Sequence, residues 1–474
     1  MDFLDHTICA PASGQGGAIA VVRVSGPQAL DCVGRIFQGH TPLSEAKGYS
    51  LHYGSIHEAD GTLLDDVVVS VFRAPHSYTG ENAVEIACHG STYIVSRLMA
   101  LLLENGAKMA APGEFTQRAY VNGKMDLSQA EAVADLIAAQ TAAAHRVALR
   151  QLKGGFSDEL AAMRAELVQV ASLMELELDF SEEDVEFADR TALRKLVGLV
   201  ISHTERLIES FRLGNAIKNG VPVAIVGNTN AGKSTLLNAL LGENRAIVSD
   251  IPGTTRDTIE EPFNLDGVLF RFIDTAGLRE SDDAIERIGV ERAYAKLSAA
   301  QIVLAVLDLT APLSAIQASA ADIQTRVAPD QQLIFLLNKA DIAPEATVVA
   351  VRKALSPASS FCISAKSGTG LDDLRHALAE HWRSLGTAAE TTLVTNTRHL
   401  EALQNAAAAL ARVQTGLQTA VPTDLVAQDL REALYHLGSI VGEVSNNEIL
   451  TNIFSRFCIG KWKMKRFETP GKEE

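Results

Sequence analysis

A glycine-rich stretch followed directly by lysine and serine is the part of this chain best suited to bind phosphate. Residues 223–235 read VAIVGNTNAGKST, so an apolar run ends at Gly227. After four more residues come Gly232, Lys233 and Ser234, which completes the pattern G-x-x-x-x-G-K-[ST] between a predicted buried strand and a predicted helix. There, backbone N–H groups and the helix dipole can bind a phosphate. The lysine can reach the β- and γ-phosphates, and the serine hydroxyl can bind Mg²⁺.

Three further motifs follow in order and indicate a guanine nucleotide. Residues 270–277 read FRFIDTAG, residues 334–341 read IFLLNKAD and residues 361–366 read FCISAK. The Asp341 carboxylate can accept hydrogen bonds from N1–H and the exocyclic amine of guanine, whereas adenine offers neither donor. Asp274 can hold Mg²⁺ through water. The predicted nucleotide-binding residues are Asn230, Ala231, Gly232, Lys233, Ser234, Thr235, Asp274, Thr275, Ala276, Gly277, Asn338, Lys339, Asp341, Ser364, Ala365 and Lys366.

The elements around these motifs predict an α/β fold combined with an all-α part. Residues 1–120 indicate a mixed α/β domain, whose predicted elements are strands over 18–24, 66–72 and 83–88 and a helix over 93–105. The GTPase motifs lie within residues 220–386. Helical periodicity fills residues 121–219 and returns in residues 387–474. We therefore predict a helical domain interrupted by an inserted Ras-like P-loop GTPase domain.

The helical periodicity on either side of the GTPase motifs indicates one shared bundle. Apolar residues fall on one face of each predicted helix, namely Leu160, Met163, Leu167, Val170 and Met174, then Leu193, Leu196, Val200, Thr204 and Leu207, and later Leu400, Leu403, Ala407, Leu410, Leu430, Leu434 and Leu437. Neither set alone can cover its apolar stripe, so the helices before and after the insertion should pack together. The alternative is two separate helical bundles.

Composition limits the class of protein. The chain has 474 residues, enough for two or three domains, and its net charge of −16 argues against a general nucleic-acid coat but leaves a local basic patch open. Five cysteines without C-x-x-C spacing predict neither a disulfide framework nor a zinc site. We see no signal peptide and no apolar run of ~18 residues, so we expect a cytoplasmic protein without a membrane span.

Four further motifs show a resemblance to a known family. GEFTQR at 113–118, GTTRD at 253–257, DTAGLRE at 274–280 and FCIGK at 457–461 resemble the MnmE (TrmE) family of tRNA-modifying GTPases. The resemblance runs from about residue 5 to residue 461. It implies a homodimer that binds the flavoprotein MnmG (GidA) as a heterotetramer. Together they would use GTP and a tetrahydrofolate, the 5,10-methylene or 5-formyl form, to add a (carboxymethyl)aminomethyl group to C5 of the wobble uridine of certain tRNAs.

The resemblance also assigns residues outside the nucleotide motifs. It places Arg23, Glu85, Lys124 and Lys461 at a folate site in the N-terminal domain, which would also carry the dimer contact. A carboxylate such as Glu85 suits the amide and amine edges of a pterin. Cys458 is a possible functional thiol, although cysteine is more often an inert buried side chain.

For hydrolysis, the resemblance implies a different water-holding group from Ras-like enzymes. Leu278 stands where those enzymes carry glutamine, and the family instead uses a glutamate that corresponds to Glu286, here predicted to be catalytic together with Lys233. A K⁺ ion would replace an arginine finger. Its predicted ligands are Asn230, Thr229, Ile247, Val248, Ser249, Pro252 and Thr254. The predicted Mg²⁺ ligands are Ser234, Asp274 and Thr255, with Thr254 as the alternative to Thr255.

Two other functions compete with this interpretation. A ribosome-associated switch GTPase of the Era or EngA type would share the nucleotide motifs, but it should carry a KH-like or second GTPase domain, which the sequence lacks. A metabolic ATPase is opposed by NKAD at 338–341. The chain departs from the family at Thr229, where proline is common, and in the tail after Lys461, which is either an RNA contact or a solvated segment.

Overall fold

A computed structural model describes residues 2–14, 16–179, 190–242, 261–265, 268–273, 300–356, 358–386, 392–419, 421–443, 450, 453–455 and 457. The chain forms two compact units. One comprises residues 1–134, 151–161 and 435–474, and the other comprises residues 135–150 and 162–434. The predicted domain boundaries near residues 120, 219 and 386 come from motifs and periodicity, and they stay predictions.

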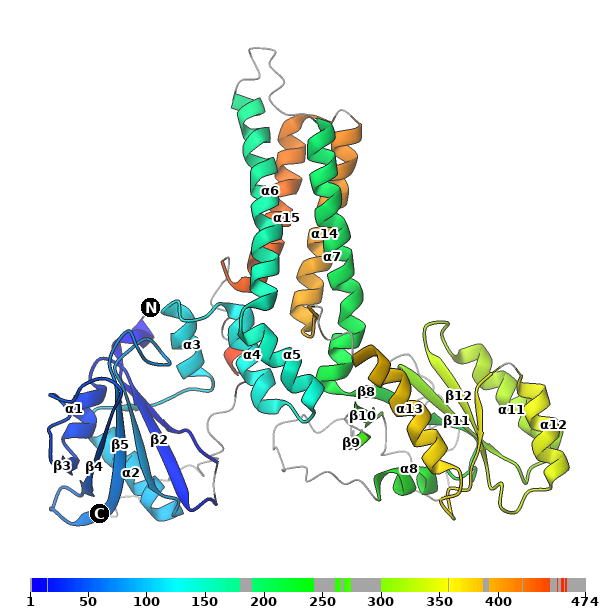
Figure 1. Cartoon of the computed structure of the whole chain (residues 1–474), viewed down its shortest axis with the longest axis horizontal. Helices are drawn as coiled ribbons and strands as arrows, with labels where there is room; N and C mark the ends of the chain where they lie inside the picture. The colour runs from blue at the N-terminus through cyan, green and yellow to red at the C-terminus, as the bar shows by residue number, and fades with distance from the viewer. Residues whose placement is uncertain are drawn as a thin grey trace, which may run out of the picture. The chain divides into compact units, whose positions relative to one another are not determined.

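The first unit contains a sheet that, within the described residues, has seven strands in the order β3-β4-β5-β6-β2-β1-β7 (Figure 1). The strands are β1 (Ile8–Pro11), β2 (Ile19–Ser25), β3 (Phe37–Gly39), β4 (Ser50–His57), β5 (Leu63–Phe72), β6 (Ala83–His89) and β7 (Lys108–Met109). The helices that accompany them are η1 (Asp2–Asp5), α1 (Ala29–Gly34), α2 (Thr92–Glu104), α3 (Glu114–Val121) and α4 (Leu127–Ala138). The three predicted strands and the predicted helix over 93–105 are confirmed.

Alternation along the strands determines which face of this sheet is buried. Val67, Val69 and Val71 of β5 are at most 2% exposed, because every second side chain points to the same face. Helix α2 covers that face with Leu98 and Leu102, and these residues belong to one apolar core. The opposite face is more exposed and carries apolar side chains such as Tyr53 and Val68.

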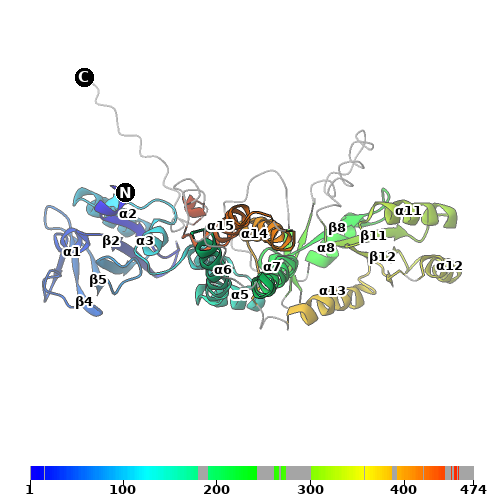
Figure 2. The ribbon, with the colours of Figure 1, turned by 90° about the horizontal axis from the view of Figure 1, so that it is seen from above.

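Long helices form the second part of the architecture. They are α5 (Ala142–Leu152), α6 (Gly155–Asp179), α7 (Arg190–Asn219), α14 (Thr397–Gln418) and α15 (Thr423–Val441). Helices α7 and α14 lie side by side in both views (Figures 1 and 2). The predicted faces are confirmed at most positions, but Leu196, Leu400, Ala407 and Leu434 are only half-buried. In α7 the neighbouring Val197 is buried instead of Leu196.

The pairing of α7 with α14 settles how the helices are organised. Gly214 of α7 allows the backbone at Val394 to approach closely, since a side-chain carbon at Gly214 would collide with the Val394 carbonyl. The Val394 N–H donates to Ser210 Oγ at 3.0 Å. Helices before and after the insertion therefore share one core, and the alternative of two separate bundles is wrong.

The inserted domain has a second sheet, with the order β13-β12-β11-β8-β10-β9 among the described residues. Its strands are β8 (Val221–Val226), β9 (Glu261–Leu265), β10 (Val268–Phe272), β11 (Ile302–Asp308), β12 (Gln332–Asn338) and β13 (Ser360–Cys362). Its helices are α8 (Lys233–Leu241), α11 (Leu313–Arg326), α12 (Glu345–Leu355) and α13 (Leu371–Gly386). All neighbouring strands are parallel except β9 and β10. Ligands bind at the carboxyl edge of such a sheet.

Other properties can be stated for the described part of the chain only. There, no helix combines the length and apolar character that crossing a membrane requires. The described cysteines are unpaired thiols, and Cys9, Cys32 and Cys88 are buried. Burial raises the pKa of the Cys88 thiol to about 11, so this side chain behaves as a small apolar core residue.

Candidate nucleotide and folate sites

The loop after β8 has the backbone shape that the phosphate-loop motif requires. Gly232 has φ +99° and directly precedes α8. A side-chain carbon at Gly232 would collide with the Asn338 amide, so glycine is needed both for the conformation and for the space. Asn230 also has a positive φ, of 61°. The exposed residues of this loop and of the start of α8 are Asn228, Thr229, Asn230, Ser234 and Thr235.

Lys233 is held inside this loop. Its Nζ donates to the carbonyl oxygens of Gly227 at 2.9 Å and Asn228 at 2.8 Å. Burial lowers the pKa of the Lys233 ammonium. The loop carbonyls therefore orient the charge near the N-terminus of α8, where a phosphate is favoured.

Asn338 joins three of the predicted motifs. Its side chain is buried, and Nδ2 donates to the Ala231 carbonyl at 2.7 Å. Its Oδ1 accepts from the Ala365 N–H at 3.0 Å. This one amide ties the phosphate loop, the NKAD motif and the SAK segment into one arrangement, while Asp341 and Lys366 remain exposed at its rim. Ser364 is buried, and its Oγ accepts from the Ser367 N–H at 3.2 Å.

Lys339 makes a contact that sequence reasoning missed. Its Nζ lies 2.6 Å from Oδ2 of Asp308, the last residue of β11. The other carboxylate oxygen accepts hydrogen bonds from Thr310, at 2.9 Å from N and 2.6 Å from Oγ1. The available sequence signal was Asp308, a carboxylate at the end of an apolar run that predicts a buried strand.

Many of the predicted residues lie outside the described part of the chain. These are the nucleotide and Mg²⁺ residues Asp274, Thr275, Ala276, Gly277 and Thr255, the predicted catalytic Glu286, the K⁺ ligands Ile247, Val248, Ser249, Pro252 and Thr254, and the C-terminal Cys458 and Lys461. Their assignments stay predictions. The described part of the nucleotide site comprises the phosphate loop, NKAD and SAK.

In the first unit, Arg23 and Glu85 meet across neighbouring strands. The register of β2 and β6 pairs them directly. Arg23 Nε and Nη2 lie 2.8 and 2.7 Å from Glu85 Oε1, and each side chain is 28% exposed. The Arg23 guanidinium lies 5.2 Å from the centre of the Tyr78 ring and 5.6 Å from that of Phe115. The arginine of this charged pair therefore lies near two aromatic rings.

Lys124, the third described residue of the predicted folate site, contacts the loop that carries Tyr78. Its Nζ donates to the Pro75 carbonyl at 3.2 Å. A side-chain carbon at Gly80 would lie 3.4 Å from Lys124 Cγ, so the lysine stem passes close to the loop. Arg23, through Tyr78, and Lys124, through Pro75, are therefore both brought to the loop of residues 75–80, and Glu85 joins them through its ion pair with Arg23.

A fully buried arginine, Arg118, pairs with Glu81, the residue that follows this loop. Arg118 has 0% side-chain exposure and lies 3.0 Å from Glu81 and 2.8 Å from Glu114. It also donates to the His6 carbonyl at 2.8 Å. Glu81 in turn accepts from Ser25 Oγ at 2.8 Å, so the network reaches back to β2. Sequence reasoning recorded Arg118 and Phe115 only as parts of the GEFTQR motif and missed Glu81 and Tyr78.

The C-terminal segment packs against the start of α3 within the same unit. Gly113 has φ +68°, and a side-chain carbon there would come within 2.8 Å of the Phe454 carbonyl. Tyr120 donates to the Gly442 carbonyl at 2.7 Å. Phe454 packs with Leu127 and Phe457 in one apolar cluster. The chain is thereby held beside α3 immediately before Cys458 and Lys461.

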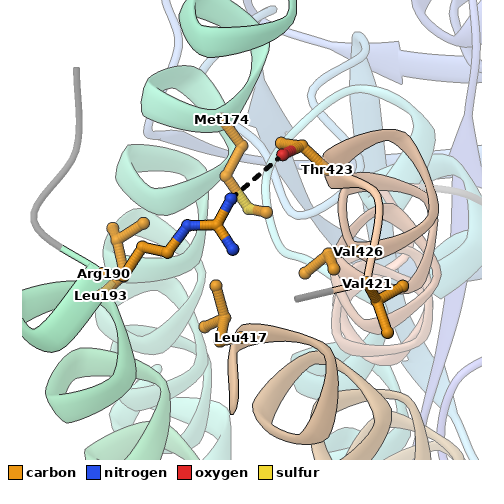
Figure 3. Close-up of a pocket in the computed structure, with 7 residues that line it drawn as sticks. All are labelled: Met174, Arg190, Leu193, Leu417, Val421, Thr423 and Val426. Atoms are coloured by element: carbon orange, nitrogen blue, oxygen red, sulfur yellow. Dashed lines mark hydrogen bonds between the residues drawn. The ribbon is translucent and has the colours of Figure 1, made fainter. Parts of the chain in front are cut away.

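A hollow in the helical bundle is mainly apolar (Figure 3). Arg190 Nη2 points across it and lies 3.5 Å from Thr423 Oγ1. The remaining lining residues are Met174, Leu193, Leu417, Val421 and Val426. This lining contains none of the predicted site residues.

Comparison with known proteins gives matches over nearly the whole chain. The family described as "GTP-binding protein TrmE N-terminus" matches residues 7–124, and "MnmE helical domain" matches residues 127–458. A protein named tRNA modification GTPase MnmE from Bacteroides thetaiotaomicron is 52% identical over 463 residues, which cover 96% of this chain and 99% of the relative. Proteins of the same name from Cytophaga hutchinsonii and Flavobacterium johnsoniae are 50% and 48% identical, with 96% of this chain and 98% and 99% of the relatives covered.

Proposed function

Since this chain belongs to the MnmE family of tRNA modification GTPases, we propose that it acts with a flavoprotein, MnmG (GidA), on the wobble uridine of certain tRNAs. The product would carry a (carboxymethyl)aminomethyl group at C5, with one carbon from a tetrahydrofolate. One observation carries this proposal: the N-terminal unit has an Arg23–Glu85 ion pair whose arginine lies near two aromatic rings, in a part of the chain distinct from the nucleotide loops. A GTPase that is only a switch needs no such second site.

The residues in the N-terminal unit fit a reduced folate by their chemistry. Glu85 can accept hydrogen bonds from the pterin, and the Tyr78 and Phe115 rings near its partner Arg23 offer flat apolar surfaces. Arg23, Lys124 and Lys461 would neutralise the glutamate tail or contact the formyl oxygen. The folate would supply the one-carbon unit, in the 5,10-methylene or 5-formyl form.

For GTP hydrolysis, we propose that the phosphate loop and its ions act on the γ-phosphate. Lys233 would contact the β- and γ-phosphates, and Ser234, Thr255 and Asp274 would hold Mg²⁺. A K⁺ ion at Asn230, Thr229 and the backbone of residues 247–254 would take the place of an arginine finger. Glu286 would orient the attacking water. Asn338 supports this assignment because its side chain is hydrogen-bonded to both Ala231 of the phosphate loop and Ala365 of the SAK segment, where a guanine nucleotide would lie.

We further propose a cytoplasmic homodimer that binds two flavoprotein subunits as a heterotetramer. The first 120 residues would hold folate and the dimer contact, and residues 220–386 would be the GTPase domain. The helical segments 121–219 and 387–474 would transmit hydrolysis to the modification centre. The contact between α7 and α14 supports this proposal, because α7 ends where the GTPase segment begins and α14 follows that segment in the chain.

The test of the folate site is binding of 5-formyl-tetrahydrofolate to the full chain. We expect retention by wild type and a loss of affinity in Glu85→Gln, because the substitution replaces one acceptor oxygen with an NH2 donor. The matched control is Glu58→Gln, which removes a carboxylate from the Arg97 ion pair of the same unit and should bind folate normally. Wild-type protein that fails to retain any reduced folate would contradict the proposal.

Two further measurements address hydrolysis and coupling. GTP turnover should rise strongly in K⁺ over Na⁺, and Asn230→Ala should reduce that difference. Glu286→Ala should bind GTP, hydrolyse it slowly and fail to support wobble-uridine modification in a mixture with the flavoprotein and tRNA. Full modification by Glu286→Ala would mean that GTP binding is sufficient.

A further inference from the structure

The strand order of the GTPase domain determines what lies beneath a bound nucleotide. Strand β11 lies between β8, which leads into the phosphate loop, and β12, which leads into Asn338 and Asp341. A nucleotide with its phosphates at the first loop and its base at Asp341 must therefore cross the carboxyl end of β11. Asp308 is the residue at that end.

Asp308 is itself held in place by both carboxylate oxygens. Oδ1 accepts from the backbone and hydroxyl of Thr310, and Oδ2 pairs with Lys339 at 2.6 Å. Burial raises the pKa of the Asp308 carboxyl, but hydrogen bonds from Lys339 and Thr310 lower it more, so the pKa lies below its usual value. The neighbouring Leu309 N–H donates to the Asn338 carbonyl at 3.1 Å, which joins this turn to the end of β12.

Lys339 connects the ends of the two strands. Its backbone has φ +64°, a left-handed conformation that directs the side chain away from the path of the strand. The ammonium reaches Asp308, so the apolar stem runs from the end of β12 to the end of β11. It is 32% exposed, and the Asp308 side chain is 22% exposed. The side chain is thus partly accessible, and its methylene groups could contact a nucleoside at this edge.

We propose that Asp308 is a positioning residue for guanine-nucleotide binding. By holding the Lys339 ammonium, it keeps the lysine stem across the carboxyl end of β11 as the surface on which the nucleoside lies. This inference rests on the proposed placement of the guanine base at Asp341. Asp308 does not have to touch the nucleotide, and its contribution passes through Lys339.

The experiment is a double-mutant cycle on GDP affinity in the full chain, measured by calorimetry. Asp308→Asn should weaken GDP binding roughly fivefold, the effect of a partly exposed ion pair. In a Lys339→Met background, which keeps the stem and removes the charge, Asp308→Asn should have no further effect. The matched control is Asp322→Asn, which removes a carboxylate from the exposed Arg326 ion pair in α11 and should leave GDP affinity unchanged.

Steady-state GTP hydrolysis separates positioning from loss of fold. Asp308→Asn should raise KM for GTP by a similar factor and leave kcat unchanged, because the γ-phosphate site is untouched. Asp308→Glu, which keeps the charge, should recover part of the lost affinity. A misfolded variant would instead lose kcat and would unfold at a lower temperature than Asp322→Asn in the absence of nucleotide, and this result would overturn the proposal.

Two other results of the double-mutant cycle would overturn the proposed role of Asp308. An equal loss from Asp308→Asn in the wild-type and Lys339→Met backgrounds would mean that Asp308 acts without the lysine, and an unchanged GDP affinity would mean that it has no role. Either result overturns the proposal. If Asp341 does not recognise guanine, wild-type protein would bind ADP as tightly as GDP, and this measurement distinguishes that case from the outcomes above.

Discussion

The two candidate sites hold their charged groups in opposite ways. In the N-terminal unit, side chains neutralise one another: Arg118 lies between two carboxylates, and Arg23 pairs with Glu85. In the nucleotide site, polar side chains are held mainly by hydrogen bonds to backbone groups. Lys233 donates to two loop carbonyls, and Asn338 contacts a carbonyl and an N–H.

This difference has a physical consequence. The stability of a site built from side-chain ion pairs depends on each partner. If one is lost, the other remains as an uncompensated, partly buried charge. A loop made of backbone hydrogen bonds depends on conformation, and most side-chain changes leave it intact. Mutations of the buried ion pairs should therefore lower the stability of the N-terminal unit, whereas mutations in the nucleotide site should mainly weaken recognition.

The largest expected effect is that of Arg118→Met. It would leave the Glu81 and Glu114 carboxylates without their buried partner, so we expect the first unit to lose about 3–5 kcal/mol of unfolding free energy. Urea unfolding of the full chain measures this loss, and GDP affinity should stay at the wild-type level. Arg97→Met is the control, since Arg97 is 31% exposed and its loss should cost less than about 1 kcal/mol. An equal loss of unfolding free energy in Arg118→Met and Arg97→Met would mean that the buried ion pairs of the first unit are no more important for stability than exposed ones.

Asp341→Asn tests recognition in the other region. The amide cannot accept both guanine donors, so GDP binding should weaken by about 2–4 kcal/mol, whereas the urea midpoint should hardly change because Asp341 is exposed. Calorimetry with GDP is the measurement, and 5-formyl-tetrahydrofolate binding is the internal control. Undiminished GDP affinity would refute the role assigned to NKAD.

Arg23→Met should reduce folate affinity by about 1.5–3 kcal/mol, because it removes a charged donor. It also leaves Glu85 without the ion pair that orients it. GDP affinity should be unaffected. Binding of 5-formyl-tetrahydrofolate to this variant and to Arg97→Met gives the comparison. Equal folate affinities of the two variants would show that Arg23 lies outside the folate site.

The smallest effect is expected from Tyr78→Phe. The change keeps the ring near Arg23 and removes only the hydroxyl that bonds to Thr116 Oγ1 at 2.9 Å. We expect a loss of about 0.5–1.5 kcal/mol in unfolding free energy, with little change in folate affinity. Urea unfolding and folate titration of the same preparation measure both. A large loss of folate affinity would mean that the hydroxyl, and not the ring, contacts the ligand.

Much of the nucleotide site could be predicted from sequence because its parts are contiguous. The phosphate loop needs only a strand, a few residues that include Gly232, and a helix, so its conformation follows from neighbours in the chain. The same holds for NKAD and SAK. Helical periodicity likewise predicted buried faces on α6 and α7, apart from the half-buried Leu196.

The tertiary structure alone decided the contacts between distant segments. Arg23 meets Glu85 through the register of β2 and β6, and Lys339 meets Asp308 because β11 and β12 are neighbours. Residue types and local spacing say nothing about such pairs, since strand order and register are properties of the whole sheet. The sequence by itself therefore determined which loops are predicted to bind phosphate and guanine, and only the folded chain decided which charged side chains meet.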